Sequence, residues 1–142
     1  MNKVTIYTDG SCLKNPGPGG WAAILLMETQ EQVLQGNEAE STNNRMELMA
    51  AIRALATLPE SSEVVLYTDS KYVQNGITSW ISKWQKNGWR TASKKPVKNV
   101  ELWQALQAES ERHQIDWCWV KGHSRHVYND RVDQLAKDAI HA

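Results

Sequence analysis

Two aspartates, Asp9 and Asp69, each follow a run of β-branched and aliphatic residues and close the same tripeptide, Tyr-Thr-Asp. If VTIYTD (residues 4–9) and VVLYTD (64–69) are adjacent parallel strands, their carboxylates emerge together at the end where open α/β sheets bind ligands. Clustered carboxylates repel each other unless a cation neutralises them. Ligands that are all oxygen favour a hard ion, Mg²⁺ first and Mn²⁺ next. The repeat therefore indicates a metal site, and the alternative is that each aspartate only ends its strand in a turn.

Glu47 and Asp133 are two further acids, and each has an ordinary structural explanation. Asn44 and Glu47 have the spacing of a capping box, and an acid in a first helical turn also suits the helix dipole. Asp133 falls in the first turn of the last expected helix, with Lys137 as its i+4 partner. The residues alone do not place either acid in the site.

His123 lies in VKGHSRH, on the expected loop before the last helix. A histidine there is either a plain surface residue or a group that moves protons near neutral pH. His126 at i+3 suggests a metal pair, but no cysteine or acid completes a zinc set.

A basic arm, defined as residues 80–99, interleaves tryptophans with lysines. There is no acid between Asp69 and Glu101, so that stretch carries seven positive charges in a chain of zero net charge. We expect its tryptophans mostly to pack onto the domain, and its charges to bind phosphate backbones in a salt-sensitive, sequence-independent way. The tryptophans and charged residues of the arm are Trp80, Lys83, Trp84, Lys86, Trp89, Arg90, Lys94, Lys95 and Lys98.

The elements that must position these residues alternate late in the chain, which favours parallel crossover units beside an antiparallel hairpin sheet, an α/β fold. NPGPGG (15–20) has the composition of a turn. The patterns predict strands at 3–8, 21–27, 32–36, 64–69 and 115–120, and helices at 42–58, 71–86, 100–112 and 129–140.

The composition is that of one globular domain, residues 1–142, without an apolar run long enough to cross a membrane. The chain enters a strand directly at its N-terminus, and two cysteines without metal spacing favour reduced thiols in a cytoplasmic protein, with one bridge as the alternative. The G-x-G-x-x-A match at Gly17 is followed by a strand and not a helix, which excludes a dinucleotide fold. An aspartyl phosphotransferase would need a second acid two residues from Asp9, and Tyr7 and Ser11 occupy those positions.

Six motifs together resemble bacterial ribonuclease H of type 1, in order and from about residue 3 to the last helix. They are YTDGS-x-x-x-NPGPGG, TNNRMELMA, TDS-x-YV, the basic arm, KKPVKN-x-x-LW and VKGH…N-x-R-x-D-x-LA. The resemblance implies the ribonuclease H fold, a five-stranded mixed sheet of three antiparallel and then two parallel strands, flanked by helices. It assigns metal-binding carboxylates to Asp9, Glu47, Asp69 and Asp133, and assistance in proton transfer or product release to His123. It assigns contacts with an RNA–DNA hybrid to Asn15, Asn43, Asn44 and Arg45, a phosphate contact to Thr42, and a basic protrusion to Trp80 through Lys98.

The implied activity is hydrolysis of the RNA strand of RNA–DNA hybrids by two Mg²⁺ ions, with little sequence preference, by a cytoplasmic monomer. Three departures from the family pattern stand out: the chain stops at Ala142, Asp130 replaces a common glutamate, and Lys71 replaces a common glutamine. Rival interpretations are a binding module without catalysis, a junction-cutting DNA nuclease of the same fold, and a scaffolding protein. The intact set of acids argues against the first, and the basic arm with the Asn-Asn-Arg run argues against the second.

Overall fold

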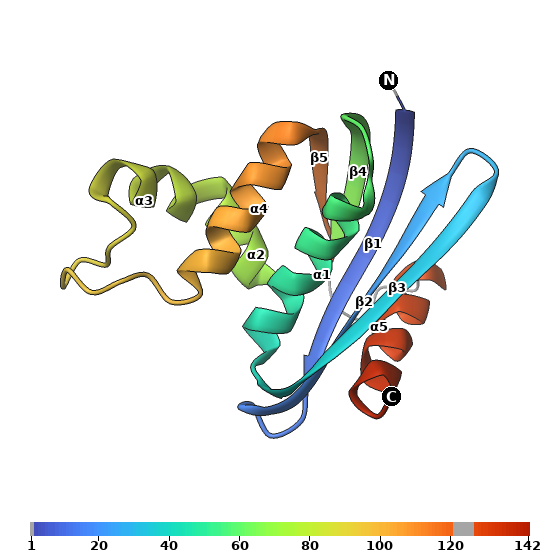
Figure 1. Cartoon of the computed structure of the whole chain (residues 1–142), viewed down its shortest axis with the longest axis horizontal. Coiled ribbons are helices and arrows are strands. Elements are labelled where there is room, and N and C mark those ends of the chain that lie inside the picture. The colour runs from blue at the N-terminus through green and yellow to red at the C-terminus, as the bar shows by residue number, and fades with distance from the viewer. Residues whose placement is uncertain (1, 121–126) are drawn as a thin grey trace.

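A five-stranded mixed sheet with helices on both faces forms the body of the molecule (Figure 1). The computed structural model describes residues 2–120 and 127–142. The strands are β1 (Asn2–Cys12), β2 (Gly17–Met27), β3 (Gln30–Ser41), β4 (Ser62–Thr68) and β5 (Gln114–Trp119). The helices are α1 (Asn43–Thr57), α2 (Lys71–Asn75), the π-helical turn η1 (Gly76–Trp80), α3 (Ile81–Asn87), α4 (Val100–Arg112) and α5 (Val127–Ile140). None of the helices in these described residues is long and apolar enough to span a membrane.

The strand order β3-β2-β1-β4-β5 places the two strands that carry the Tyr-Thr-Asp repeats side by side. β1 pairs antiparallel with β2, and β2 antiparallel with β3. β1 pairs parallel with β4, and β4 parallel with β5. This arrangement of three antiparallel strands followed by two parallel ones confirms the predicted fold class.

Alternate side chains of the central strands face different helices, as the pleat of a strand requires. Val4 and Ile6 of β1 are buried in the cluster beneath α1, whereas Tyr7 packs with residues of α5 on the opposite face. In Figure 1, α1 and α4 lie on one side of the sheet and α5 on the other. Asp9 follows Tyr7 by two residues in β1, so its side chain lies on the same face of the sheet as Tyr7, the face covered by α5.

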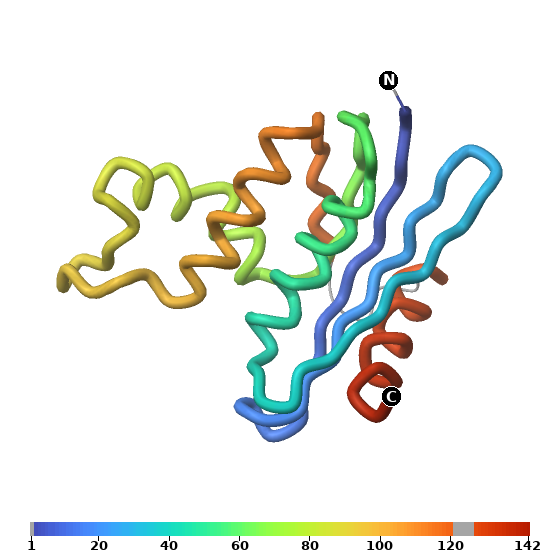
Figure 2. Tube along the Cα trace, in the orientation of Figure 1, coloured from blue at the N-terminus to red at the C-terminus, as the bar shows by residue number. Residues whose placement is uncertain are grey.

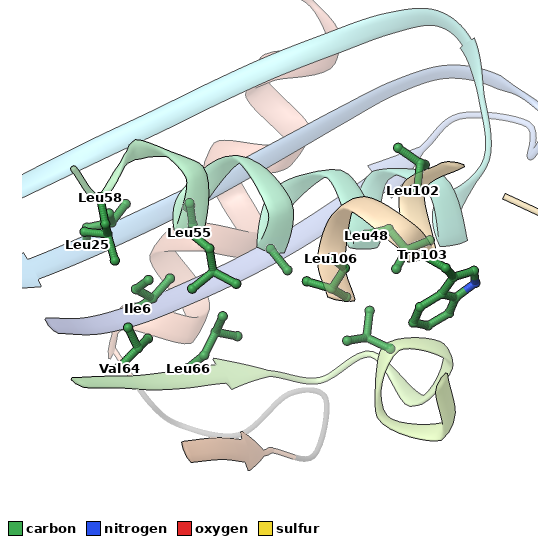
Figure 3. Close-up of a cluster of buried hydrophobic side chains, with 14 of the residues drawn as sticks. Ile6, Leu25, Leu48, Leu55, Leu58, Val64, Leu66, Leu102, Trp103 and Leu106 are labelled. Carbon is green, nitrogen blue, oxygen red and sulfur yellow. The ribbon is translucent and has the colours of Figure 1, made fainter. Parts of the chain in front are cut away.

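The main core lies between α1, α4 and the sheet (Figure 3). Leu48 and Leu55 of α1 are fully buried there, and Ile52 packs against the cluster, so these residues form the apolar face of the helix. Trp103 of α4 is the largest fully buried side chain. Each such side chain contributes about 1.5–3 kcal/mol relative to an exposed one, so the core holds α1 firmly above β1 and β4.

The turn predicted for NPGPGG (15–20) is partly wrong, because Gly17–Gly20 lies inside β2. A Cβ at Gly20 would lie 2.4 Å from the carbonyl oxygen of Ala136 in α5, and one at Gly19 would lie 2.8 Å from Cγ of Met46 in α1. These glycines are needed because helices approach the strand backbone closely from both faces. Turn composition and close packing select the same residue type, so the sequence did not separate them.

The predicted helix at 71–86 is wrong in one respect, because it is interrupted by the π-helical turn η1. The turn begins at Gly76, where a Cβ would lie 2.0 Å from the ring of Trp103. The indole of α4 therefore packs directly on the helix backbone at this point. β3 is also longer than the predicted 32–36. The prediction was too short because most side chains of this strand are exposed and give no apolar alternation.

Candidate active site

Three carboxylates meet where the parallel pairing of β1 and β4 ends. Ligand oxygens of Asp9, Glu47 and Asp69 all lie within 4.8 Å of one another. Asp9 is buried, Glu47 is partly buried and Asp69 is exposed, so the cluster opens to solvent on the Asp69 side. The structure thus brings together three of the four acids that the sequence singled out.

Strand register accounts for the meeting of the two aspartates. The last residues that β1 and β4 pair in parallel are Tyr7 and Tyr67. β4 ends at Thr68, whereas β1 continues to Cys12 and pairs Asp9 with Ala22 of β2. The prediction that Asp9 ends its strand is therefore wrong, but Asp9 does lie just beyond the last parallel neighbour, level with Asp69.

Glu47 reaches the cluster from α1, and it takes no part in capping that helix. The N-cap is Thr42, whose hydroxyl accepts a hydrogen bond of 3.1 Å from the backbone N–H of Arg45. The Asn44–Glu47 capping box considered from the sequence is therefore wrong. The Glu47 carboxylate instead accepts a hydrogen bond from the backbone N–H of Gly10 and interacts with the Ser70 side chain.

Gly10 and Ser70 are functional positions that the sequence reasoning missed. A Cβ at Gly10 would lie 2.5 Å from the backbone nitrogen of Glu47, so a glycine is required for α1 to approach β1 this closely. Ser70 also caps α2, accepting a 3.1 Å hydrogen bond from the N–H of Val73. The sequence did contain a signal for these two positions, because a small residue follows each Tyr-Thr-Asp tripeptide.

Crowding perturbs the protonation of the buried acids in the metal-free protein. Burial, then the neighbouring Glu47, and further the contacts with Asp133 and Asp69, raise the pKa of Asp9 far above its usual range. Burial, and then the charge of Asp69, raise the pKa of Glu47. Groups that resist ionisation in this way are held ready for a cation, because bound positive charge removes the cost of ionising them.

Asp133 lies in α5, and its interaction with Asp9 is one of the causes that raise the pKa of Asp9. It also forms the i,i+4 ion pair with Lys137 that the sequence suggested, with 3.1 Å between Nζ and Oδ2. The ion pair is thus confirmed, whereas the predicted first-turn position is wrong, since the acid of the first turn of α5 is Asp130. Metal binding by Asp133 stays a prediction. His123 lies outside the described residues.

A polar patch, defined as Asn15 and residues 42–45, lies at the start of α1. The Asn15 side chain accepts a 3.0 Å hydrogen bond from the backbone N–H of Asn43, which joins the loop after β1 to the helix. Asn15, Asn43 and Asn44 are exposed. The patch therefore presents short polar side chains to solvent about one helical turn before Glu47.

Arg45, the last residue of this patch, is held by two acids. Its guanidinium binds Glu38 of β3 through Nε at 2.7 Å and Nη2 at 3.2 Å, and it binds Glu101 of α4 at 3.2 Å. This network fixes the side chain in place and ties β3, α1 and α4 together. Sequence reasoning expected a hybrid contact from Arg45 but did not identify its two acidic partners.

The basic arm projects from the body, as Figure 2 shows for α3 and the loop that follows. Its six charged side chains are all exposed. Its three tryptophans are partly buried and pack on the core, and Trp84 lies 5.6 Å from the ring of Trp103 and 5.9 Å from that of Trp89. The predicted packing of the tryptophans is thus confirmed, and the charged side chains are exposed, while their binding of phosphates stays a prediction.

The acid cluster suits a metal ion, since each of Asp9, Glu47 and Asp69 offers an oxygen and no sulfur or imidazole takes part. Fold and site together define an α/β protein that gathers carboxylates at the carboxyl ends of parallel strands, beside an exposed basic arm. Comparisons with known proteins give this class its family.

The RNase H family model matches residues 1–141. Ribonuclease H of Alcanivorax borkumensis is 63% identical over 140 residues, which is 99% of this chain and 93% of the relative. The crystal structure of LC9-RNase H1, a type 1 RNase H with the type 2 active-site motif, aligns with a TM-score of 0.89 at 30% identity, over 99% of this chain and 73% of that one. LC11-RNase H1, solved in complex with RNA/DNA hybrid, has the same fold at a TM-score of 0.64 and 22% identity, over 97% and 96% of the two chains. The chain belongs to the ribonuclease H family, a family of hydrolytic nucleases.

Proposed function

We propose that this protein is an endonuclease that hydrolyses the RNA strand of RNA–DNA hybrids and requires a divalent metal. The observation that carries the proposal is the convergence of Asp9, Glu47 and Asp69, from three separate elements, in a chain of the ribonuclease H family. Asp133 completes the set of proposed metal ligands. The proposed unit is a single domain of residues 1–142, acting as a cytoplasmic monomer.

The proposed metal is Mg²⁺, with Mn²⁺ as a substitute. When bound, two such ions would supply an activated water and a stabilised leaving 3′-oxygen for in-line hydrolysis, giving 5′-phosphate and 3′-hydroxyl ends. The four carboxylates would hold the ions, and the Gly10 N–H and Ser70 would keep Glu47 oriented toward them. His123 would assist proton transfer or product release.

The polar patch and the basic arm are proposed to bind the two strands of the hybrid. Selectivity for RNA requires contacts with 2′-hydroxyls across a wide, shallow minor groove. Asn15, Asn43 and Asn44 are exposed and short enough to make them, Thr42 would contact a phosphate, and Arg45 would act from its fixed position. The arm would bind phosphates of the DNA strand, and since backbone contacts carry little base information, sequence preference is expected to be slight.

The test is a gel assay in which one labelled RNA strand is supplied as RNA–DNA hybrid, as single-stranded RNA and as double-stranded RNA. Each substrate is incubated with Mg²⁺, with Mn²⁺ and with EDTA. Asp9→Asn removes one charge of the cluster, and Asp116→Asn, at an exposed position of β5, is the matched control.

Cleavage of the hybrid alone, lost with EDTA and with Asp9→Asn but kept with Asp116→Asn, is the expected result. Tight binding of the hybrid without cleavage by either metal would instead establish a binding module. Cleavage of branched DNA in place of the hybrid would establish the junction-cutting alternative.

A further inference from the structure

Three tyrosines from three different elements stack against one another on the α5 face of the sheet. The ring of Tyr7 in β1 lies 4.7 Å from that of Tyr67 in β4, with 8° between the ring planes. It lies 5.0 Å from the ring of Tyr128 in α5, with 24° between the planes. Tyr7 is buried, whereas Tyr67 and Tyr128 are partly buried. We call these residues the tyrosine stack.

Each member of the stack lies in an element that contains, or directly precedes, an acid of the candidate site. Tyr7 precedes Asp9 by two residues within β1, so their side chains share a face of the sheet. Tyr67 precedes Asp69 by two residues, and Asp69 follows the end of β4 directly. Tyr128 lies in the first turn of α5, which carries Asp133 one turn later. The stack therefore joins β1, β4 and α5 directly beside the place where their acids meet.

Contacts on the other side of Tyr128 hold the same turn of α5. The guanidinium of Arg131 lies 5.6 Å from the centre of the Tyr128 ring. Arg131 also donates two hydrogen bonds of 2.9 Å to Glu31 of β3. Val127, the first residue of the helix, is exposed and does not pack on the sheet. Tyr128 is therefore the first side chain of α5 that attaches the helix to the central strands.

The position of Asp133 is important because a metal site tolerates little displacement of its ligands. Residues that orient metal ligands affect metal affinity by about 10- to 100-fold. Val132 and Ala136 pack α5 against Tyr7 of β1, so the interaction between Asp133 and Asp9 depends on where the start of α5 lies. We propose that the tyrosine stack positions Asp133 relative to Asp9 and Asp69, so that Tyr128 acts as a positioning residue for the metal centre. The proposal rests on the proposed function in taking Asp133 as a metal ligand.

The test measures metal binding without substrate, by titrating Mn²⁺ into the full-length protein in a calorimeter. Tyr128→Leu removes the stacking ring but keeps an apolar side chain, and Tyr128→Phe keeps the ring without the hydroxyl. Leu135→Ala is the matched control, because Leu135 packs on the same apolar cluster from a later turn of α5. Urea unfolding of each variant reports its stability.

Tyr128→Leu is expected to weaken Mn²⁺ binding about tenfold or more, while Tyr128→Phe binds as the parent protein does. Leu135→Ala is expected to lower stability and leave Mn²⁺ affinity unchanged. In the hybrid-cleavage assay, Tyr128→Leu should raise the metal concentration needed for half-maximal rate and lower kcat, without raising KM for the hybrid.

Three results would overturn the proposal: folded Tyr128→Leu protein with unchanged Mn²⁺ affinity, equal losses for the leucine and phenylalanine variants, or an equal loss for Leu135→Ala. Absence of Mn²⁺ binding by the parent protein would overturn it as well. If Tyr128→Leu does not fold, Tyr67→Leu tests the stack from β4. Mn²⁺ binding that depends on Tyr128, in a protein that cleaves no hybrid, would refute the proposed function while upholding the positioning role.

Discussion

Replacing Asp9 by asparagine is expected to stabilise the metal-free protein at neutral pH, although it removes a proposed metal ligand. Burial and the surrounding acids raise the pKa of Asp9 to about 11 in the folded state, against 3.8 for an ordinary aspartate. Because the folded pKa is the higher one, the folded protein binds more protons than the unfolded chain between these values. Stability therefore falls as the pH rises through this window.

The size of the effect follows from the same linkage. One extra proton on the folded state costs about 1.4 kcal/mol of stability per pH unit, or at most about 4 kcal/mol between about pH 5 and about pH 8. Asparagine has nearly the same shape and no charge, so Asp9→Asn removes this part of the pH dependence. Glu47, whose pKa is also raised, interacts with Asp9, so its own part of the pH dependence changes with the substitution as well.

Urea unfolding in EDTA at the two pH values measures the difference, and Asp116→Asn serves as the charge-matched control. The parent protein should lose more stability toward alkaline pH than the Asp9→Asn variant, by about 2–4 kcal/mol. Added Mg²⁺ should stabilise the parent more than the variant, since ligand binding to the folded state adds to stability. Equal pH dependence in the two proteins, or a less stable variant at about pH 8, would refute the reasoning.

Three further substitutions test separate parts of the structure. Thr42→Ala removes the N-cap hydrogen bond of α1 and should cost about 1 kcal/mol in urea unfolding, with Thr42→Ser close to the parent. Gly76→Ala places a methyl group against the ring of Trp103 and should cost about 1–3 kcal/mol. The same change at Gly88, where an added Cβ would meet no atom within 4 Å but φ is +73°, should strain only the local backbone and leave the near-ultraviolet signal of the tryptophans unchanged. A double Lys94→Ala, Lys95→Ala variant should reduce the salt dependence of hybrid binding by about one unit of slope per lysine, measured by fluorescence anisotropy in EDTA. An unchanged slope would show that the arm does not bind phosphates.

The meeting of Asp9 with Asp69 was predictable from the sequence because it depends only on repeated strand patterns. Two parallel strands in register carry equal positions to equal heights, and the pairing of Tyr7 with Tyr67 provides that register. The charge of the basic arm was equally predictable, since it follows from composition. Local sequence patterns are enough to predict a contact when two neighbouring elements carry the same pattern.

Glu47 was not predictable from the residues alone, because its place depends on contacts that are distant in the sequence. The glycine at position 10 admits α1 close to β1, and the hydrogen bond from Gly10 to Glu47 spans 37 residues. The π-helical turn at Gly76 likewise depends on an indole 27 residues further along, Trp103. A capping-box pattern was present at Asn44, but the N-cap of α1 is Thr42, two residues earlier. The resemblance to ribonuclease H of type 1 supplied what local patterns did not.

The charges of the chain are unevenly distributed although its formal net charge is zero. Positive charge is concentrated on the projecting arm, and the rest of the chain carries the compensating negative charge. A polyanion approaching within about a Debye length, roughly 8–10 Å at moderate salt, therefore turns the protein before it attracts it. With the proposed function, the arm is expected to meet the nucleic acid before the acid cluster does, and the rate at which the encounter complex forms is expected to depend on that alignment.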